Sequence, residues 1–117
     1  MTITGTSESP VTITKSGSAA SGGQVGDDYN FYGINSGIVV SGSTSSATIE
    51  YAEITTSANG SNAIVATNGA SVTVKNTEIT TSGNAGSRGL HCTYAGSIEA
   101  ESCTITTAGA SCAALAT

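Results

Sequence analysis

The phrase Glu53-Ile54-Thr55-Thr56-Ser57 recurs as Glu78-Ile79-Thr80-Thr81-Ser82 and, with small changes, as Thr104-Ile105-Thr106-Thr107-Ala108. Ile79 follows Ile54 by 25 positions, and Ile105 follows Ile79 by 26. A repeat of this length indicates a solenoid, in which each unit stacks on the one before it. The sequence therefore predicts the architecture more directly than it predicts a function.

Two further sets of residues align with the repeated isoleucines at the same spacing. Upstream of them lie Ala47-Thr48-Ile49, Val72-Thr73-Val74 and Ile98-Glu99-Ala100, and between the repeats lie Ile38-Val39-Val40, Ile64-Val65-Ala66, Leu90-His91-Cys92 and Leu115-Ala116-Thr117. Each set alternates inward and outward positions, as half-buried strands do. Gly and Asn residues between the sets mark corners. We predict an all-β parallel β-helix of about four coils, with three strands per coil.

The chain of 117 residues has the length of one domain, 1–117. The regular coils are predicted to occupy 46–117. Before them, 14–36 reads as a long N-terminal loop excursion, because no coil strand follows Val11-Thr12-Ile13-Thr14 until Ile38. This excursion contains Tyr29-Asn30-Phe31-Tyr32, which concentrates the aromatic residues of the chain in its least repetitive segment.

The charge pattern excludes several classes of partner. The chain carries three Lys and Arg residues and a formal net charge of −5, so it lacks the basic patch that nucleic acids or anionic membranes require. The sequence contains no apolar run long enough to span a membrane, and no signal peptide is recognisable after Met1. Because Ser/Thr/Gly-rich repeats with little Lys are typical of exported surface proteins, we expect an extracellular or cell-surface segment of a larger protein.

These coils resemble the right-handed parallel β-helix repeats of the pectate-lyase-like superfamily, especially the Ser/Thr-rich forms in bacterial surface proteins and adhesins. The resemblance is carried by Ala47-Thr48-Ile49 with Glu53-Ile54-Thr55 and by the matching stretches of the next two coils. It implies a right-handed helix. It also implies either a polysaccharide lyase or hydrolase or a noncatalytic, carbohydrate-associated module, and the fold alone does not choose between them.

The excursion holds the main candidate ligand site. Asp27 and Asp28 supply oxygen atoms that suit calcium, and Tyr29, Phe31 and Tyr32 supply rings on which a sugar could stack. The alternative is a covering loop, whose aromatic residues pack over the outward apolar column of Val39 and Val65. No catalytic residues are assigned.

Glu53 and Glu78 are predicted to stack one coil apart, at roughly 4.8 Å, either around a calcium ion or as a solvated pair with a modest repulsion. Calcium is thus the one candidate cofactor, at Asp27, Asp28, Glu53 or Glu78. Lys75 aligns with Glu50 and Glu101, which reads as charge compensation between neighbouring strands.

Other polar residues receive structural interpretations. Cys92 and Cys103 are expected to be small core residues and Cys112 an exposed corner thiol, because their spacing matches no compact zinc motif. His91 is predicted to be a surface residue. Asn59-Gly60-Ser61 fits a glycosylation sequon but equally an ordinary turn.

Two columns of threonine complete the pattern. The inward residues Thr56, Thr81 and Thr107 are expected to form a hydroxyl ladder, while the outward residues Thr55, Thr80 and Thr106 raise ice binding as a minor alternative. The favoured function is a noncatalytic extracellular β-helix module in adhesion or carbohydrate association, with a glycan or a host surface as partner. A fragment of a polysaccharide lyase or hydrolase, and a scaffold that self-assembles end to end into a homo-oligomer, remain as alternatives.

Overall fold

The computed structural model describes residues 1–17, 31–110 and 112–117, and they form an all-β solenoid. The strands within these residues are β1 Thr2–Thr4, β2 Val11–Lys15, β3 Ile38–Ser41, β4 Ser46–Glu50, β5 Ala52–Thr56, β6 Ile64–Thr67, β7 Ser71–Lys75, β8 Glu78–Thr81, β9 Leu90–Cys92, β10 Ser97–Glu101, β11 Thr104–Thr107 and β12 Leu115–Ala116. Asp27, Asp28 and Tyr29 lie outside the described residues, so the structure does not test their predicted roles.

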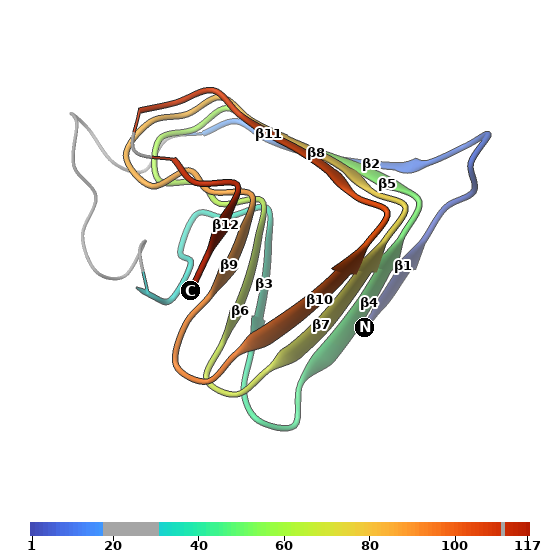
Figure 1. Ribbon diagram of the computed structural model, residues 1–117, viewed down its shortest axis with the longest axis horizontal. Coiled ribbons are helices and arrows are strands. Elements are labelled where there is room, and N and C mark those ends of the chain that lie inside the picture. The colour runs from blue at the N-terminus through green and yellow to red at the C-terminus, as the bar shows by residue number, and fades with distance from the viewer. Residues whose placement is uncertain (18–30, 111) are drawn as a thin grey trace.

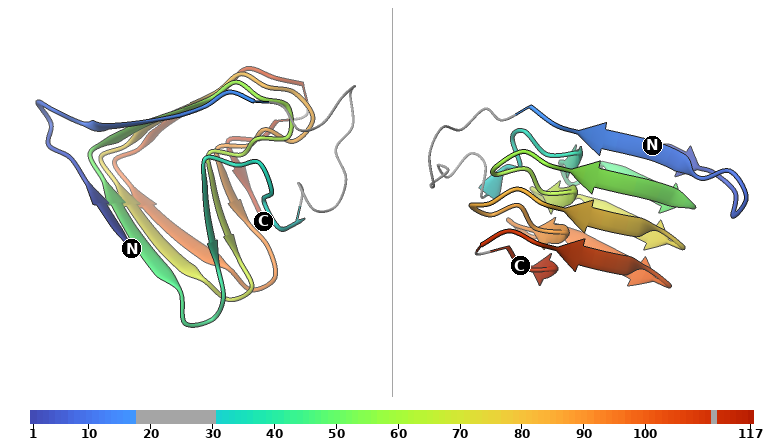
Figure 2. Two further views of the ribbon diagram at one scale, coloured as in Figure 1. Left: turned by 180° about the vertical axis from the view of Figure 1, so that it is seen from behind. Right: turned by 90° about the horizontal axis from the view of Figure 1, so that it is seen from above.

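The strands form three parallel sheets, which are the three sides of the solenoid seen in Figure 1. The first sheet has the order β1-β4-β7-β10, the second β11-β8-β5-β2 and the third β12-β9-β6-β3. The chain therefore passes once through every sheet in each coil, and successive coils stack along the axis, as Figure 2 shows from above. The predicted parallel β-helix with three strands per coil is confirmed.

The strand register is the one that the sequence repeats predict. Ile79 pairs with Ile54 on one side and with Ile105 on the other, and Ile64 pairs with Leu90 in the third sheet. Inward side chains consequently stack in columns, and Ile54, Ile64 and Ile79 are each 1% exposed or less. Burying such a side chain stabilises the fold by roughly 1.5–3 kcal/mol, so these columns form the continuous core.

The regular register extends closer to the N-terminus than the coils predicted for 46–117. Ile3 of β1 pairs with Ile49, and Ile13 of β2 pairs with Ile54, so the first coil already has all of its strands. The excursion predicted for 14–36 therefore begins beyond Lys15, where β2 ends. Beyond the residues that the structure does not describe, 31–37 follow the outside of the third sheet (Figure 1).

The inward threonines do not form the predicted hydroxyl ladder. Each of their hydroxyls donates instead to a carbonyl in the corner of its own coil, with oxygen distances of 2.7–3.0 Å. The pairs are Thr56 with Ser61, Thr81 with Ser87 and Thr107 with Cys112. Because Thr56 and Thr81 are fully buried, these bonds satisfy carbonyl groups that water does not reach.

Candidate functional site

Three aromatic side chains meet on the surface at the corner between the third and first sheets. The rings of Tyr32 and Tyr94 are stacked, with centroids 5.2 Å apart and planes 29° from parallel, and Phe31 lies 6.0 Å from Tyr94. We call these residues the aromatic cluster. Their side chains are 42%, 44% and 52% exposed for Phe31, Tyr32 and Tyr94, so the rings offer free apolar surface to a ligand.

Two hydroxyls of the solenoid hold the excursion at this corner. The Thr67 hydroxyl donates to the carbonyl oxygen of Phe31 across 3.2 Å, and the Thr93 hydroxyl contacts the same oxygen. The two hydroxyl oxygens are themselves 2.8 Å apart. Because Thr67 and Thr93 occupy neighbouring coils, the contact ties residue 31 to two rungs of the third sheet and positions its ring beside Tyr94.

The excursion also covers part of the third sheet. Gly33, at a φ of 71°, lies so close to Val65 that an added Cβ would stand 2.8 Å from the valine side chain. Val65 is fully buried and His91, its register partner, is 5% exposed. The excursion therefore covers Val65 as predicted, but with Gly33, whereas its rings lie against Tyr94 and Val39 stays 43% exposed. The prediction of a surface histidine is wrong, because outward residues under the excursion are buried.

The backbone at Tyr94 adopts an unfavourable conformation. Tyr94 and Ala95 have φ values of 43° and 64°, in the left-handed region. The preceding coil places Asn68 and Gly69 at the corresponding corner, with φ values of 54° and 82°. Asn and Gly tolerate this region, whereas other residues pay roughly 1–2 kcal/mol each. Tyr94 was not predicted as a site residue, although its replacement of Asn in an aligned corner is visible in the sequence.

The predicted stacking of Glu53 on Glu78 is confirmed, because the two residues are directly paired between β5 and β8. Both are exposed, and they line a cavity of about 240 Å³ with Tyr51 and Asn76 at the corner between the first and second sheets. Within the described residues, no three His, Cys, Asp or Glu side chains gather as a bound metal would require. A calcium site at Glu53 and Glu78 stays a prediction.

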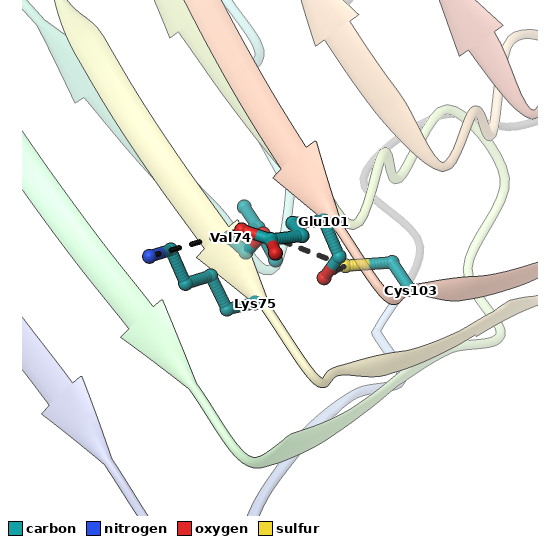
Figure 3. Close-up of polar contacts among 4 residues, drawn as sticks. All are labelled: Val74, Lys75, Glu101 and Cys103. Atoms are coloured by element: carbon teal, nitrogen blue, oxygen red, sulfur yellow. Dashed lines mark hydrogen bonds and ion pairs between the residues drawn. The ribbon is translucent and has the colours of Figure 1, made fainter.

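Lys75 lies in the predicted column between Glu50 and Glu101. Its ammonium group is 3.8 Å from a carboxylate oxygen of Glu101, and Figure 3 shows this pair beside Cys103. Because both side chains are largely exposed, the pair contributes at most about 1 kcal/mol. The arrangement is charge compensation between β7 and β10.

The three cysteines carry free thiols and are all partly buried. Cys92 and Cys103 pack against the core, as predicted, and burial raises the pKa of the Cys92 thiol despite an opposing backbone hydrogen bond at Ile98. Cys112 occupies the register position of Ser87 and accepts a hydrogen bond from the Ser87 backbone N–H at 3.2 Å. It is less exposed than predicted, since its coil packs on the one before it.

The sequon at Asn59 is engaged in corner packing. The side-chain oxygen of Asn59 accepts a hydrogen bond from the backbone N–H of Asn84 at 2.9 Å, and Ser61 is fully buried. Asn84 repeats the arrangement by accepting from the N–H of Ala110 at 2.8 Å. The turn interpretation of Asn59-Gly60-Ser61 therefore agrees with the structure.

Outward threonines form one continuous column on the second sheet. The residues Thr14, Thr55, Thr80 and Thr106 are in register across all of its strands. The neighbouring outward column contains Glu53 and Glu78 between two threonines. The charged residues interrupt the uncharged surface that ordered water would need, and ice binding stays untested.

Sheets, register and corners together define the chain as a parallel β-helix. Residues 9–115 match the family model described as a right-handed β-helix region, and the chain belongs to this family. Neither the comparison with curated proteins nor the comparison with solved structures found a match. No helix in the described part of the chain is long and apolar enough to cross a membrane.

Proposed function

We propose that this chain is a noncatalytic module of an extracellular surface protein and that it acts in adhesion or carbohydrate association. The aromatic cluster is the observation that supports this proposal. It joins Phe31 and Tyr32 of the excursion to Tyr94, a corner residue more than sixty positions away, and it leaves all three rings about half exposed. Rings with a polar handle suit surfaces that are apolar on one side and hydroxylated on the other, as sugars are.

A glycan array with the purified chain tests this proposal. We expect binding to at least one glycan, and we expect Tyr32→Ala to abolish it, because the substitution removes the ring that stacks on Tyr94. Running the array with calcium and with chelator also tests the candidate calcium ligands, Asp27 and Asp28 included. A blank array, or binding that Tyr32→Ala leaves unchanged, would contradict the proposal.

A polysaccharide lyase or hydrolase remains the second candidate, and the cavity beside Glu53 and Glu78 is the feature that favours it. Glycoside hydrolysis needs two carboxyl groups about 5–10 Å apart, one of them acting as an acid. This candidate requires Asp27 and Asp28 to approach the glutamate pair. Cleavage of a polysaccharide that Glu53→Gln and Asp27→Asn both abolish would support it over the noncatalytic module.

A self-assembling scaffold is the third candidate. Leu115 is 65% exposed, and a cavity of about 380 Å³ opens among Leu90, Ile98 and Leu115 at the face of the last coil. A second copy stacked there through its β1, β2 and β3 edges would bury this apolar surface and pair the strand edges. A molecular mass that stays monomeric over a wide concentration range would count against this candidate.

A further inference from the structure

We infer that the ligand of the aromatic cluster is a neutral polysaccharide chain, an inference that rests on the proposed carbohydrate association. The three rings supply apolar surface, and hydroxyl-bearing side chains lie on one side of Tyr94. A cavity of about 420 Å³ extends from Tyr94 to the face of the last coil and is lined by Thr93, Ser97 and Ile98 among others. This mixture of ring, hydroxyl and aliphatic surface matches a pyranose, whose C–H face is apolar and whose rim carries hydroxyls.

Charge argues against an anionic glycan. The chain has a net charge of −5, and its only cations are Lys15, Lys75 and Arg88. Lys75 pairs with Glu101, Lys15 donates to the carbonyl of residue 17, and Arg88 donates to a carbonyl within its own corner. None of these contacts belongs to the aromatic cluster. A polyuronate or a sulfated glycan would approach an acidic protein, and no contact given for the described residues places one of these cations at the rings.

Shape argues for a chain rather than a free sugar. Pockets for small molecules enclose most of the ligand surface, whereas the rings of the aromatic cluster are 42–52% exposed and lie at an outer corner of the solenoid. A single pyranose would contact one side of such a surface only. A chain can contact the exposed outer side of the stacked pair and continue along the adjoining cavity, and the contacts then add within one molecule.

The left-handed conformation at Tyr94 allows a substitution that removes the ring without straining the backbone. Tyr94→Asn introduces the residue that the preceding coil uses at the same place, Asn68, so it removes the ring and keeps the backbone conformation. Tyr51 provides the control, because it is also left-handed, at a φ of 51°, and the next coil places Asn76 at its corner, at 48°. Tyr51→Asn therefore makes the same chemical change away from the aromatic cluster.

The experiment is affinity electrophoresis of the full chain through gels containing hydroxyethyl cellulose, xyloglucan or galactomannan as neutral polymers, and polygalacturonate or heparin as anionic ones. We expect retardation by at least one neutral polymer, unchanged by chelator, and none by the anionic polymers. Tyr94→Asn should weaken this binding about tenfold, the loss of about 1.4 kcal/mol. Tyr51→Asn, which changes the cavity beside Glu53 and Glu78 instead, should bind like the unsubstituted protein, and weakened binding in this variant alone would overturn the site.

The outcomes separate this inference from the proposed function. Retardation by polygalacturonate or heparin alone would overturn the neutral ligand and leave carbohydrate association standing. Retardation by a neutral polymer that Tyr94→Asn does not weaken would overturn the site. No retardation by any of the polymers would overturn the inference and count against carbohydrate association itself. Circular dichroism of both variants distinguishes lost binding from lost folding.

Discussion

Ala95→Gly should stabilise the protein, because Ala95 holds a φ of 64° at the corner beside the aromatic cluster. A residue with a Cβ costs roughly 1–2 kcal/mol in this left-handed region, whereas glycine adopts it freely. Glycine also makes the unfolded chain more flexible, which offsets roughly 0.5–1 kcal/mol of the gain. Since Ala95 is exposed, little packing is lost with its methyl group. We expect a net increase of about 0.5–1 kcal/mol in the free energy of unfolding.

Thermal unfolding followed by circular dichroism measures this change. With an unfolding entropy of about 2.1 cal/mol/K per residue, the expected gain corresponds to a rise of about 2–4 °C in Tm. Ala100→Gly is the matched control, because Ala100 lies in strand β10 and has no positive φ. There the same substitution should lower the stability by roughly 0.5–1 kcal/mol. A fall in Tm for Ala95→Gly would refute the assignment of strain to this corner.

Three further predictions concern the solenoid itself. Thr81→Val should destabilise the protein by about 1–3 kcal/mol in urea unfolding, because it removes the hydroxyl that donates to the buried Ser87 carbonyl 2.7 Å away. The control Thr55→Val, at an exposed position, should change stability by less than about 0.5 kcal/mol. Gly83→Ala should prevent stable folding, as measured by circular dichroism, since the added Cβ would lie 2.0 Å from the Ala58 carbonyl oxygen of the previous coil. The control Gly17→Ala should fold normally, because its Cβ would meet only the end of a lysine side chain at 3.6 Å. Burial raises the pKa of the Cys92 thiol above the usual 9.0 and so reduces its thiolate fraction, and we expect slower alkylation at pH 8 in the folded protein than in urea. Mass spectrometry measures the two rates, and equal rates would contradict this prediction.

The sequence predicts the solenoid because each coil repeats the same physical requirements. A parallel stack pairs equivalent positions of successive coils, so the inward isoleucines must recur at the coil length, and Ile54, Ile79 and Ile105 do so. Their spacing therefore determines strand, face and register together. The strands of the first coil are harder to predict from the repeat. Thr2–Thr4 is short, and the excursion separates β2 from β3.

The aromatic cluster was harder to predict because the excursion has no repeat that sets its position. The rings of Phe31 and Tyr32 were recognised as candidates, but their docking place depends on two hydroxyls, those of Thr67 and Thr93. Outward threonines are also common on the first two sheets, so a threonine does not by itself mark a docking place. The burial of His91 has the same origin, because alternation assigns it an outward position and only the covering excursion removes it from solvent.

Tyr94, by contrast, could be found by comparing aligned corners. Once the coils are in register, its corner requires two left-handed residues, and the preceding coil meets that requirement with Asn68 and Gly69. Tyr94 and Ala95 adopt the same conformation at a cost of roughly 1–2 kcal/mol each, and strain of this kind persists where surrounding structure maintains it. Tyr51 shows that strain is not sufficient, because it has a similar φ but, among the described residues, no stacked ring such as Tyr94 has in Tyr32. The combination of an unfavourable corner residue and a second exposed ring stacked on it is therefore what distinguishes the proposed binding surface from an ordinary turn.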